Sequence, residues 1–147
     1  MKIDGACFCG HVQYEAELDP GRVALCHCTD CQISSGTAMG WGVAVVEDRF
    51  ELKRGTLKTF VKTAESGRRR ALQFCPECGT RIVSSPLPGE QGTISLRAGS
   101  IRQRDQLRPR AHIWARSAQP WIDDLQELPK IEQQPDLAMT THTRTRS

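Results

Sequence analysis

The chain has 147 residues and a mass of 16.4 kDa, enough for one domain with a buried core and too little for two full-sized domains. Hydrophobic residues make up 38% and charged residues 25%, a composition that excludes a disordered chain and a membrane protein. Twenty Lys and Arg against 17 Asp and Glu leave a formal net charge of +3, which does not demand a nucleic-acid partner.

No stretch approaches the ~20 apolar residues that cross a bilayer, because the longest apolar run, Met39–Val46, stops at Glu47. The first residues, Met1 to Gly5, lack the apolar segment of a secretory signal. We therefore expect no membrane partner and a cytoplasmic location, in which thiols stay reduced.

The first predicted strand covers residues 11–18, where apolar and polar side chains alternate with a period of two. One face carries Val12, Tyr14, Ala16 and Leu18. A short helical turn is expected at Thr29–Ser35, with Asp30 near its start. A second strand is expected at Gly42–Val46, which consists of small and β-branched residues.

Two further segments, Phe50–Lys53 and Leu57–Val61, predict a hairpin joined near Arg54-Gly55-Thr56. The remaining predicted strands are Arg70–Phe74, Arg81–Ser84 and Thr93–Ala98. Short strands at regular spacing, separated by turn residues, favour a mainly β domain with little helix. We expect this domain to span residues 1–129. The segment 130–147, rich in Thr, Gln and charge, is predicted to be a flexible tail.

Seven cysteines fall into three close groups: Cys7 and Cys9, then Cys26, Cys28 and Cys31, then Cys75 and Cys78. An odd number cannot pair completely within one chain, and clustered cysteines in a reducing compartment more often hold metal. Short spacings matter because several thiolates must each reach one ion at about 2.3 Å. Thiolate sites with these spacings favour zinc.

Seven thiolates divide naturally into a closed site of four and an open site of three, which leaves one position for water or substrate. Spacing alone does not decide the division. Cys28 and Cys31 with Cys75 and Cys78 form one possible closed site. The other closes Cys7, Cys9, Cys75 and Cys78, and leaves Cys26, Cys28 and Cys31 open. We favour the second, because those last three residues are close enough to cap one ion from a single loop.

Several motifs occur together, in the order Gly5–Gly10, Cys26–Cys31 with Ser35–Gly36, Phe74–Gly79, His112–Trp114 and Pro120–Trp121. In combination they resemble the glutathione-dependent formaldehyde-activating enzyme family, which also includes centromere protein V. The resemblance runs from about Gly5 to Leu128.

This resemblance implies an Mss4-like fold of packed antiparallel sheets and two zinc ions per chain. It places Cys7, Cys9, Cys75 and Cys78 around a structural zinc, and Cys26, Cys28 and Cys31 around a catalytic one. The implied reaction is that of a carbon–sulfur lyase, which joins glutathione and formaldehyde into S-hydroxymethylglutathione or cleaves that adduct. Another aldehyde or a related small thiol would suit the same chemistry.

Glutathione carries two carboxylates, so its site should supply arginine side chains or backbone N–H donors. The substrate-binding candidates are Ser34, Ser35, Gly36, Arg68, Arg69, Arg97 and Arg110, together with His112 and Trp114 as walls of a pocket. Each arginine has the alternative of being a solvated surface charge, and His112 that of a packed strand residue. His27, between two expected ligands, is the catalytic candidate for carrying a proton; it is alternatively a further metal contact or an exposed side chain.

Two functions compete most directly. One is a zinc-dependent lyase acting on glutathione adducts, and the other is a zinc-stabilised binding module without catalysis. Nucleic-acid binding through the arginines is a third hypothesis, which the small net charge and the 5% aromatic content disfavour.

Overall fold

The computed structural model describes residues 1–135 and shows a mainly β protein, as predicted. The strands are β1 (Lys2–Ala6), β2 (Gln13–Cys26), β3 (Gly40–Arg54), β4 (Lys58–Thr63), β5 (Arg69–Phe74), β6 (Arg81–Ser85), β7 (Ser95–Arg97) and β8 (Ala111–Ile113). One α-helix, α1, covers Thr29–Ser35. Four 3-10 turns, η1 to η4, follow at Ala98–Ser100, Arg104–Gln106, Ala115–Ser117 and Ile122–Glu127.

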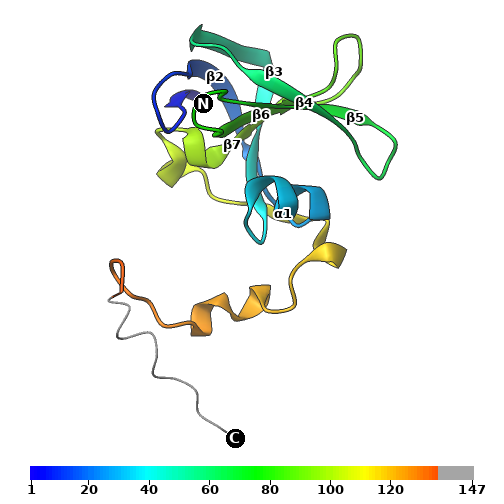
Figure 1. The fold of residues 1–147 in the computed structure, drawn as a ribbon. Coiled ribbons are helices and arrows are strands. Elements are labelled where there is room, and N and C mark those ends of the chain that lie inside the picture. The colour runs from blue at the N-terminus through cyan, green and yellow to red at the C-terminus, as the bar shows by residue number, and fades with distance from the viewer. Residues whose placement is uncertain (136–147) are drawn as a thin grey trace, which may run out of the picture.

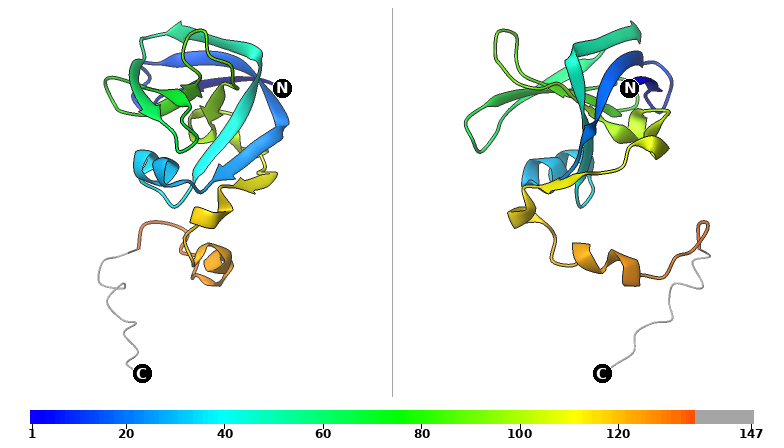
Figure 2. Two further views of the ribbon diagram at one scale, coloured as in Figure 1. Left: turned by 90° about the vertical axis from the view of Figure 1, so that its right-hand side faces the viewer. Right: turned by 180° about the vertical axis from the view of Figure 1, so that it is seen from behind.

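The strands form one continuous sheet in the order β1-β2-β3-β7-β6-β5-β4. These neighbours are antiparallel, whereas β8 lies parallel to the last residues of β2. The long strands β2 and β3 shift register at bulges, so they curve through the molecule (Figure 1). Helix α1 lies at one end of the sheet, and the segment after β8 passes this end and runs away from the strands (Figures 1 and 2).

The predicted strand at residues 11–18 begins two residues before β2, a longer strand that runs from Gln13 to Cys26. Its apolar face is buried as expected: Val12, Tyr14 and Leu18 are at most 1% exposed. The core continues through Val43 on β3 and Leu96 on β7, which pair across the sheet. This layer of branched side chains holds one face of the sheet together.

The predicted hairpin between 50–53 and 57–61 is wrong, because the two segments lie far apart in the sheet. The end of β3 pairs with the start of β2, and β4 pairs with β5 at the opposite edge. Pairing with β2 places Phe50 against Tyr14, with ring centroids 5.5 Å apart. A local hairpin would forgo this aromatic contact, so tertiary packing overrides the turn signal at Gly55.

The C-terminal prediction of a flexible tail at 130–147 extends beyond what the structure describes, since residues 136–147 lie outside it. Residues 130–135 are irregular and almost entirely exposed. Within residues 1–135, no helix combines the length and apolar character needed to cross a membrane.

Gly5 marks the tightest packing between β1 and the core. A Cβ atom there would lie 2.3 Å from the Tyr14 ring and 2.7 Å from the Ser100 carbonyl oxygen. We expect Gly5→Ala to lower the free energy of unfolding by about 1–3 kcal/mol, because the side chain overpacks the core. Gly99→Ala is the control, since a Cβ atom at Gly99 meets nothing within 4 Å. Denaturant unfolding measures both variants, and equal stability would contradict this account.

Candidate metal centres

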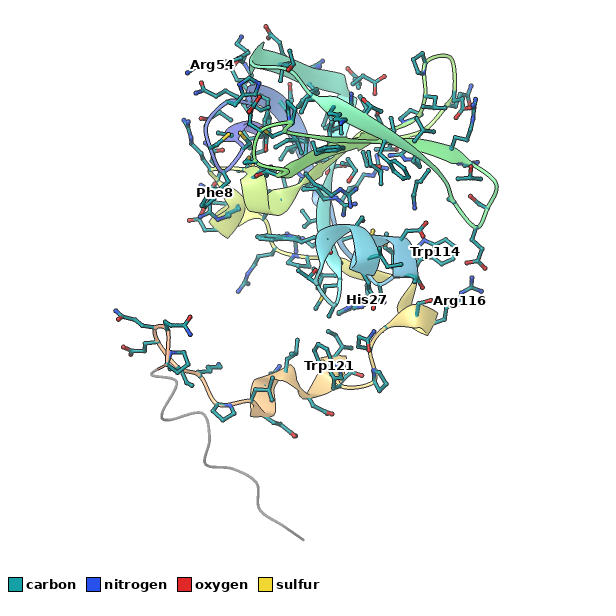
Figure 3. The ribbon with its side chains drawn as sticks, viewed as in Figure 1. Phe8, His27, Arg54, Trp114, Arg116 and Trp121 are labelled. Carbon is teal, nitrogen blue, oxygen red and sulfur yellow. The ribbon has the colours of Figure 1, made fainter. Side chains whose placement is uncertain are left out.

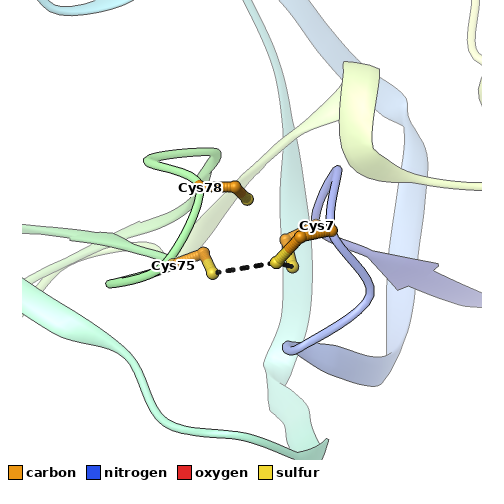
Figure 4. A group of neighbouring side chains, drawn as sticks. Cys7, Cys75 and Cys78 are labelled. Carbon is orange, nitrogen blue, oxygen red and sulfur yellow. Dashed lines mark hydrogen bonds between the residues drawn. The ribbon is translucent and has the colours of Figure 1, made fainter.

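Four cysteines converge from two turns that are distant in the sequence. Cys7 and Cys9 come from the β1–β2 turn, and Cys75 and Cys78 from the β5–β6 turn (Figure 4). Their four sulfur atoms lie within 4.8 Å of one another, with 3.6 Å between Cys7 and Cys9 and 3.8 Å between Cys9 and Cys75. Metal–sulfur bonds of about 2.3 Å in a tetrahedron separate the sulfurs by about 3.8 Å, so the cluster has the dimensions of a four-thiolate site.

Both turns have the same local construction. The amide of Gly10 donates to the Cys7 carbonyl, and the amide of Gly79 donates to the Cys75 carbonyl. Gly10 and Gly79 have φ angles of 78° and 74°, in the left-handed region that glycine adopts without strain. Each glycine reverses the chain immediately after its cysteines, so both sulfurs of a turn face one point.

Hydrogen bonds favour negative charge on two of these sulfurs, those of Cys7 and Cys78, whereas desolvation and the neighbouring thiols raise the pKa of Cys9. The hydroxyl and the backbone of Thr80 lower the pKa of Cys78 to about 5. The amide of Val12 donates to the Cys7 sulfur at 3.2 Å. Since a metal ligand must be the thiolate, both contacts prepare the cluster for a cation.

Three further cysteines gather where β2 ends and α1 begins. Cys26 is the last residue of β2, Cys28 is the N-cap of α1, and Cys31 lies in its first turn. Their sulfurs also lie within 4.8 Å of one another, and those of Cys26 and Cys28 are 3.4 Å apart. A disulfide needs about 2.05 Å between sulfurs, so these thiols are free.

The Cys31 sulfur has an unusually favourable environment for charge. The Cys26 thiol, as hydrogen-bond donor, lowers the pKa of Cys31 to about 5, and the guanidinium of Arg97 contributes in the same direction. The Nη2 atom of Arg97 lies 3.7 Å from the Cys31 sulfur. The amide of Cys31 in turn donates to the Cys28 sulfur at 3.3 Å. The Arg97 guanidinium and the Cys31 amide therefore favour thiolates at this cluster, whereas the Cys26 proton is lost when Cys26 itself binds a cation.

A cavity of about 1070 Å³ opens beside the three-cysteine cluster. Cys26, Cys28 and Cys31 all line it, whereas none of the four cysteines of the other cluster does. Its walls come from α1, the β4–β5 hairpin, one face of strands β3 and β5–β7, and residues 110–114. The two clusters thus differ in access: only the three-cysteine cluster can meet a small molecule in this cavity.

The comparison with known families matches residues 2–117 to the glutathione-dependent formaldehyde-activating enzyme family. The chain belongs to this family. A crystal structure of a Rhodobacter sphaeroides protein shares its fold, with a TM-score of 0.56 at 16% identity. That match covers 75% of this chain and 99% of the other. No curated protein matches the chain.

Within this family domain, most of the substrate-binding candidates lie at the cavity. Its lining includes Ser34, Arg68, Arg69, Arg97, Arg110 and Trp114. Three others do not line it, in contrast to our expectation: Ser35, Gly36 and His112. Ser35 donates to the Cys31 carbonyl at 2.6 Å, and Gly36 ends α1 with a φ angle of 67°. Both therefore belong to the C-terminal end of the helix and do not line the cavity.

His27 and His112 form a stacked pair, and Figure 3 shows His27 at the end of the molecule where α1 lies. The Nε2 atom of His27 lies 2.8 Å from Nδ1 of His112, and the His27 side chain is fully buried. His27 neither lines the cavity nor joins the sulfur cluster. Backbone alternation explains this, because ligands at Cys26 and Cys28 turn the residue between them to the opposite face. A proton-carrying role for His27 has no contact with the cavity to support it.

Trp114 forms a wall of the cavity and has a left-handed backbone, with a φ angle of 56°. Such a conformation costs about 1–2 kcal/mol for a residue with a side chain, so its surroundings must hold it. The Arg116 guanidinium lies 5.1 Å from the Trp114 ring centre and 2.5 Å from a carboxylate oxygen of Glu65. Glu65 belongs to the β4–β5 turn, so these contacts join the two rims of the cavity.

Sequence reasoning missed three cavity arginines, Arg22, Arg70 and Arg81. Arg70 lines the cavity together with its neighbours Arg68 and Arg69, so the run of three arginines was the signal that could have found it. Arg81 follows the Cys75–Gly79 turn as the first residue of β6. Its position beside the cavity depends on how β6 packs against α1, which no local pattern indicates.

The two clusters should respond differently to loss of a ligand. Cys75→Ser should remove one metal ion and lower the free energy of unfolding by about 2 kcal/mol or more. The substitution removes a ligand from the site that connects the two turns within the core. Cys28→Ser should remove the other ion and leave the fold intact, since a serine hydroxyl also caps α1. Metal analysis and thermal unfolding on protein purified under reducing conditions measure both effects. Equal destabilisation by the two substitutions would contradict the distinction.

Proposed function

We propose that the protein is a zinc-dependent carbon–sulfur lyase that forms and cleaves S-hydroxymethylglutathione or the aldehyde adduct of a related small thiol. The observation that carries this proposal is the three-cysteine cluster opening into a large cavity. Membership of a family named for glutathione-dependent formaldehyde activation supports the substrate class.

The two clusters suggest one zinc ion each, with unequal roles. Cys7, Cys9, Cys75 and Cys78 supply a complete set of four ligands, which is typical of a structural site. Cys26, Cys28 and Cys31 supply three, so a fourth position is available to a ligand in the cavity. Zinc bound there would hold a substrate thiolate and act as a Lewis acid.

The reaction itself is an addition. The sulfur of the thiol forms a bond to the carbonyl carbon of formaldehyde, the carbonyl π bond breaks, and the thiol proton ends on the new hydroxyl. The chain contributes by placing both reactants together in a cavity, which removes much of the entropic cost of their encounter. Arg97 stabilises the thiolate form of Cys31 and so keeps that ligand charged throughout.

Cysteines clustered at spacings that suit metal are typical of reducing compartments, so we also propose a cytoplasmic location. The alternative function is a zinc-stabilised binding module without catalysis. A volume of about 1070 Å³ exceeds what a buried structural site needs and suits a small peptide, which supports the enzyme over the module.

Exchange NMR on mixtures of glutathione and formaldehyde tests the activity against the spontaneous reaction. With the zinc-loaded protein, the rate of adduct formation should rise in proportion to protein concentration. Cys28→Ser should lower kcat/KM by about 100-fold, because the site loses its metal and its positioned thiol. Arg102→Gln is the matched control, since Arg102 pairs with Asp4 far from the cavity. If the protein binds glutathione and leaves the spontaneous rate unchanged, the binding module is the correct function.

A further inference from the structure

Three arginines project into the cavity from adjacent strands: Arg70 from β5, Arg81 from β6 and Arg97 from β7. None of them has a carboxylate partner within residues 1–135. Of the other cations at this cavity, Lys62 pairs with Asp30 at 2.5 Å and Arg69 with Glu90 at 2.7 Å, whereas Arg22, Arg68 and Arg110 also have no carboxylate partner within residues 1–135. Arg70, Arg81 and Arg97 thus form a group of adjacent arginines without carboxylate partners, of which Arg97 faces the Cys31 sulfur.

Neutral acceptors hold two of these guanidinium groups in place, those of Arg70 and Arg81. Arg70 donates to the carbonyl oxygens of Ser84 and Thr93, each at 2.9 Å, and Arg81 donates to the hydroxyl of Ser34. Carbonyl and hydroxyl oxygens orient a guanidinium without cancelling its charge. The arginines are therefore pre-organised for an anion that the protein itself does not supply.

One donor of this group has no acceptor. The Nη2 atom of Arg81 is buried and makes no hydrogen bond within the described part of the chain. Burial, and next the charge of Arg97, lowers the pKa of Arg81 to about 10, and the same two causes lower the pKa of Arg70. Burying the unpaired Nη2 donor of Arg81 beside two like charges lowers the stability of the fold. An anionic ligand that accepts from this donor would remove that cost.

The sheet leaves room for such a ligand. Gly42 and Ala44 on β3, Ser95 on β7 and Ser84 on β6 lie on one face and line the cavity with small side chains. Their neighbours Val43, Val83 and Leu96 point to the opposite face and fill the core. Gly40 extends this floor, because a Cβ atom there would lie 2.5 Å from Nη1 of Arg97.

The charges on this face do not cancel. Three thiolates and one divalent cation carry a net charge of −1, and the neighbouring Arg97 balances it. Arg70 and Arg81 then remain as two positive charges with planar donor groups, a geometry that matches carboxylates. We propose that Arg70, Arg81 and Arg97 form a carboxylate-binding site that restricts the adjoining three-cysteine centre to anionic thiols. That the substrate is a thiol rests on the proposed function.

Binding of two probes tests this site separately from catalysis. S-methylglutathione keeps both carboxylates and has its sulfur blocked, while its diethyl ester lacks the negative charges. Calorimetry on the zinc-loaded full chain, at constant ionic strength, should show the acid binding at least tenfold more tightly than the ester. Arg70→Gln and Arg81→Gln should each weaken binding of the acid at least tenfold and leave binding of the ester unchanged.

Two further variants sharpen the result. Arg81→Lys keeps the charge and loses the planar fork, so its affinity for the acid should fall between those of the wild type and Arg81→Gln. Arg102→Gln removes an arginine that pairs with Asp4 and does not line the cavity, and it should bind the acid as the wild type does. Should the glutamine variants fail to fold, the comparison of acid and ester on the wild type decides alone.

Equal affinity for the acid and the ester would overturn the carboxylate site, as would unchanged affinity in folded Arg70→Gln and Arg81→Gln proteins. If the protein still turns over glutathione when either of these results is found, the proposed lyase activity is supported and the carboxylate site is refuted. Arginine-dependent binding of the acid without turnover would support the site and refute the catalysis.

Discussion

The convergence of four thiols from two distant turns is the constraint on which the remaining structure depends. Cys9 and Cys75 are 66 residues apart, yet their sulfurs lie 3.8 Å from each other. This contact joins the β1–β2 turn to the β5–β6 turn, which belong to separate parts of the sheet order. It thereby sets how β5 and β6 approach β2, and hence where Arg70, Arg81 and the end of β2 face the cavity.

Access separates the roles of the two cysteine clusters. Cys7 and Cys75 are at most 5% exposed and pack within the hydrophobic core, so that cluster acts as part of the core. Cys26, Cys28 and Cys31 border the cavity instead, next to positive charge. A net charge of +3 gives no sign of this arrangement, because the significant feature is the local placement of Arg70, Arg81 and Arg97 on adjacent strands.

Local patterns predicted the strand beginning near Val12 and the helix at Thr29–Ser35, because burial alternation and capping depend on neighbouring residues. They failed at the end of β3. The segment Phe50–Arg54 has the length and turn signal of a hairpin, yet it pairs with β2. Strand partners are chosen by the burial of side chains such as Phe50 and Tyr14, which are distant in the sequence.

By itself, the sequence determined the chemistry of this protein: seven thiols in three groups, spaced for metal, in a pattern that places it in its family. Only the tertiary structure decided what surrounds them. It turned His27 away from the cavity towards His112 and brought Arg70 and Arg81 beside the three-cysteine centre. Ligand spacing is a local property of the backbone, whereas the neighbours of a site come from strands that meet only when the sheet forms.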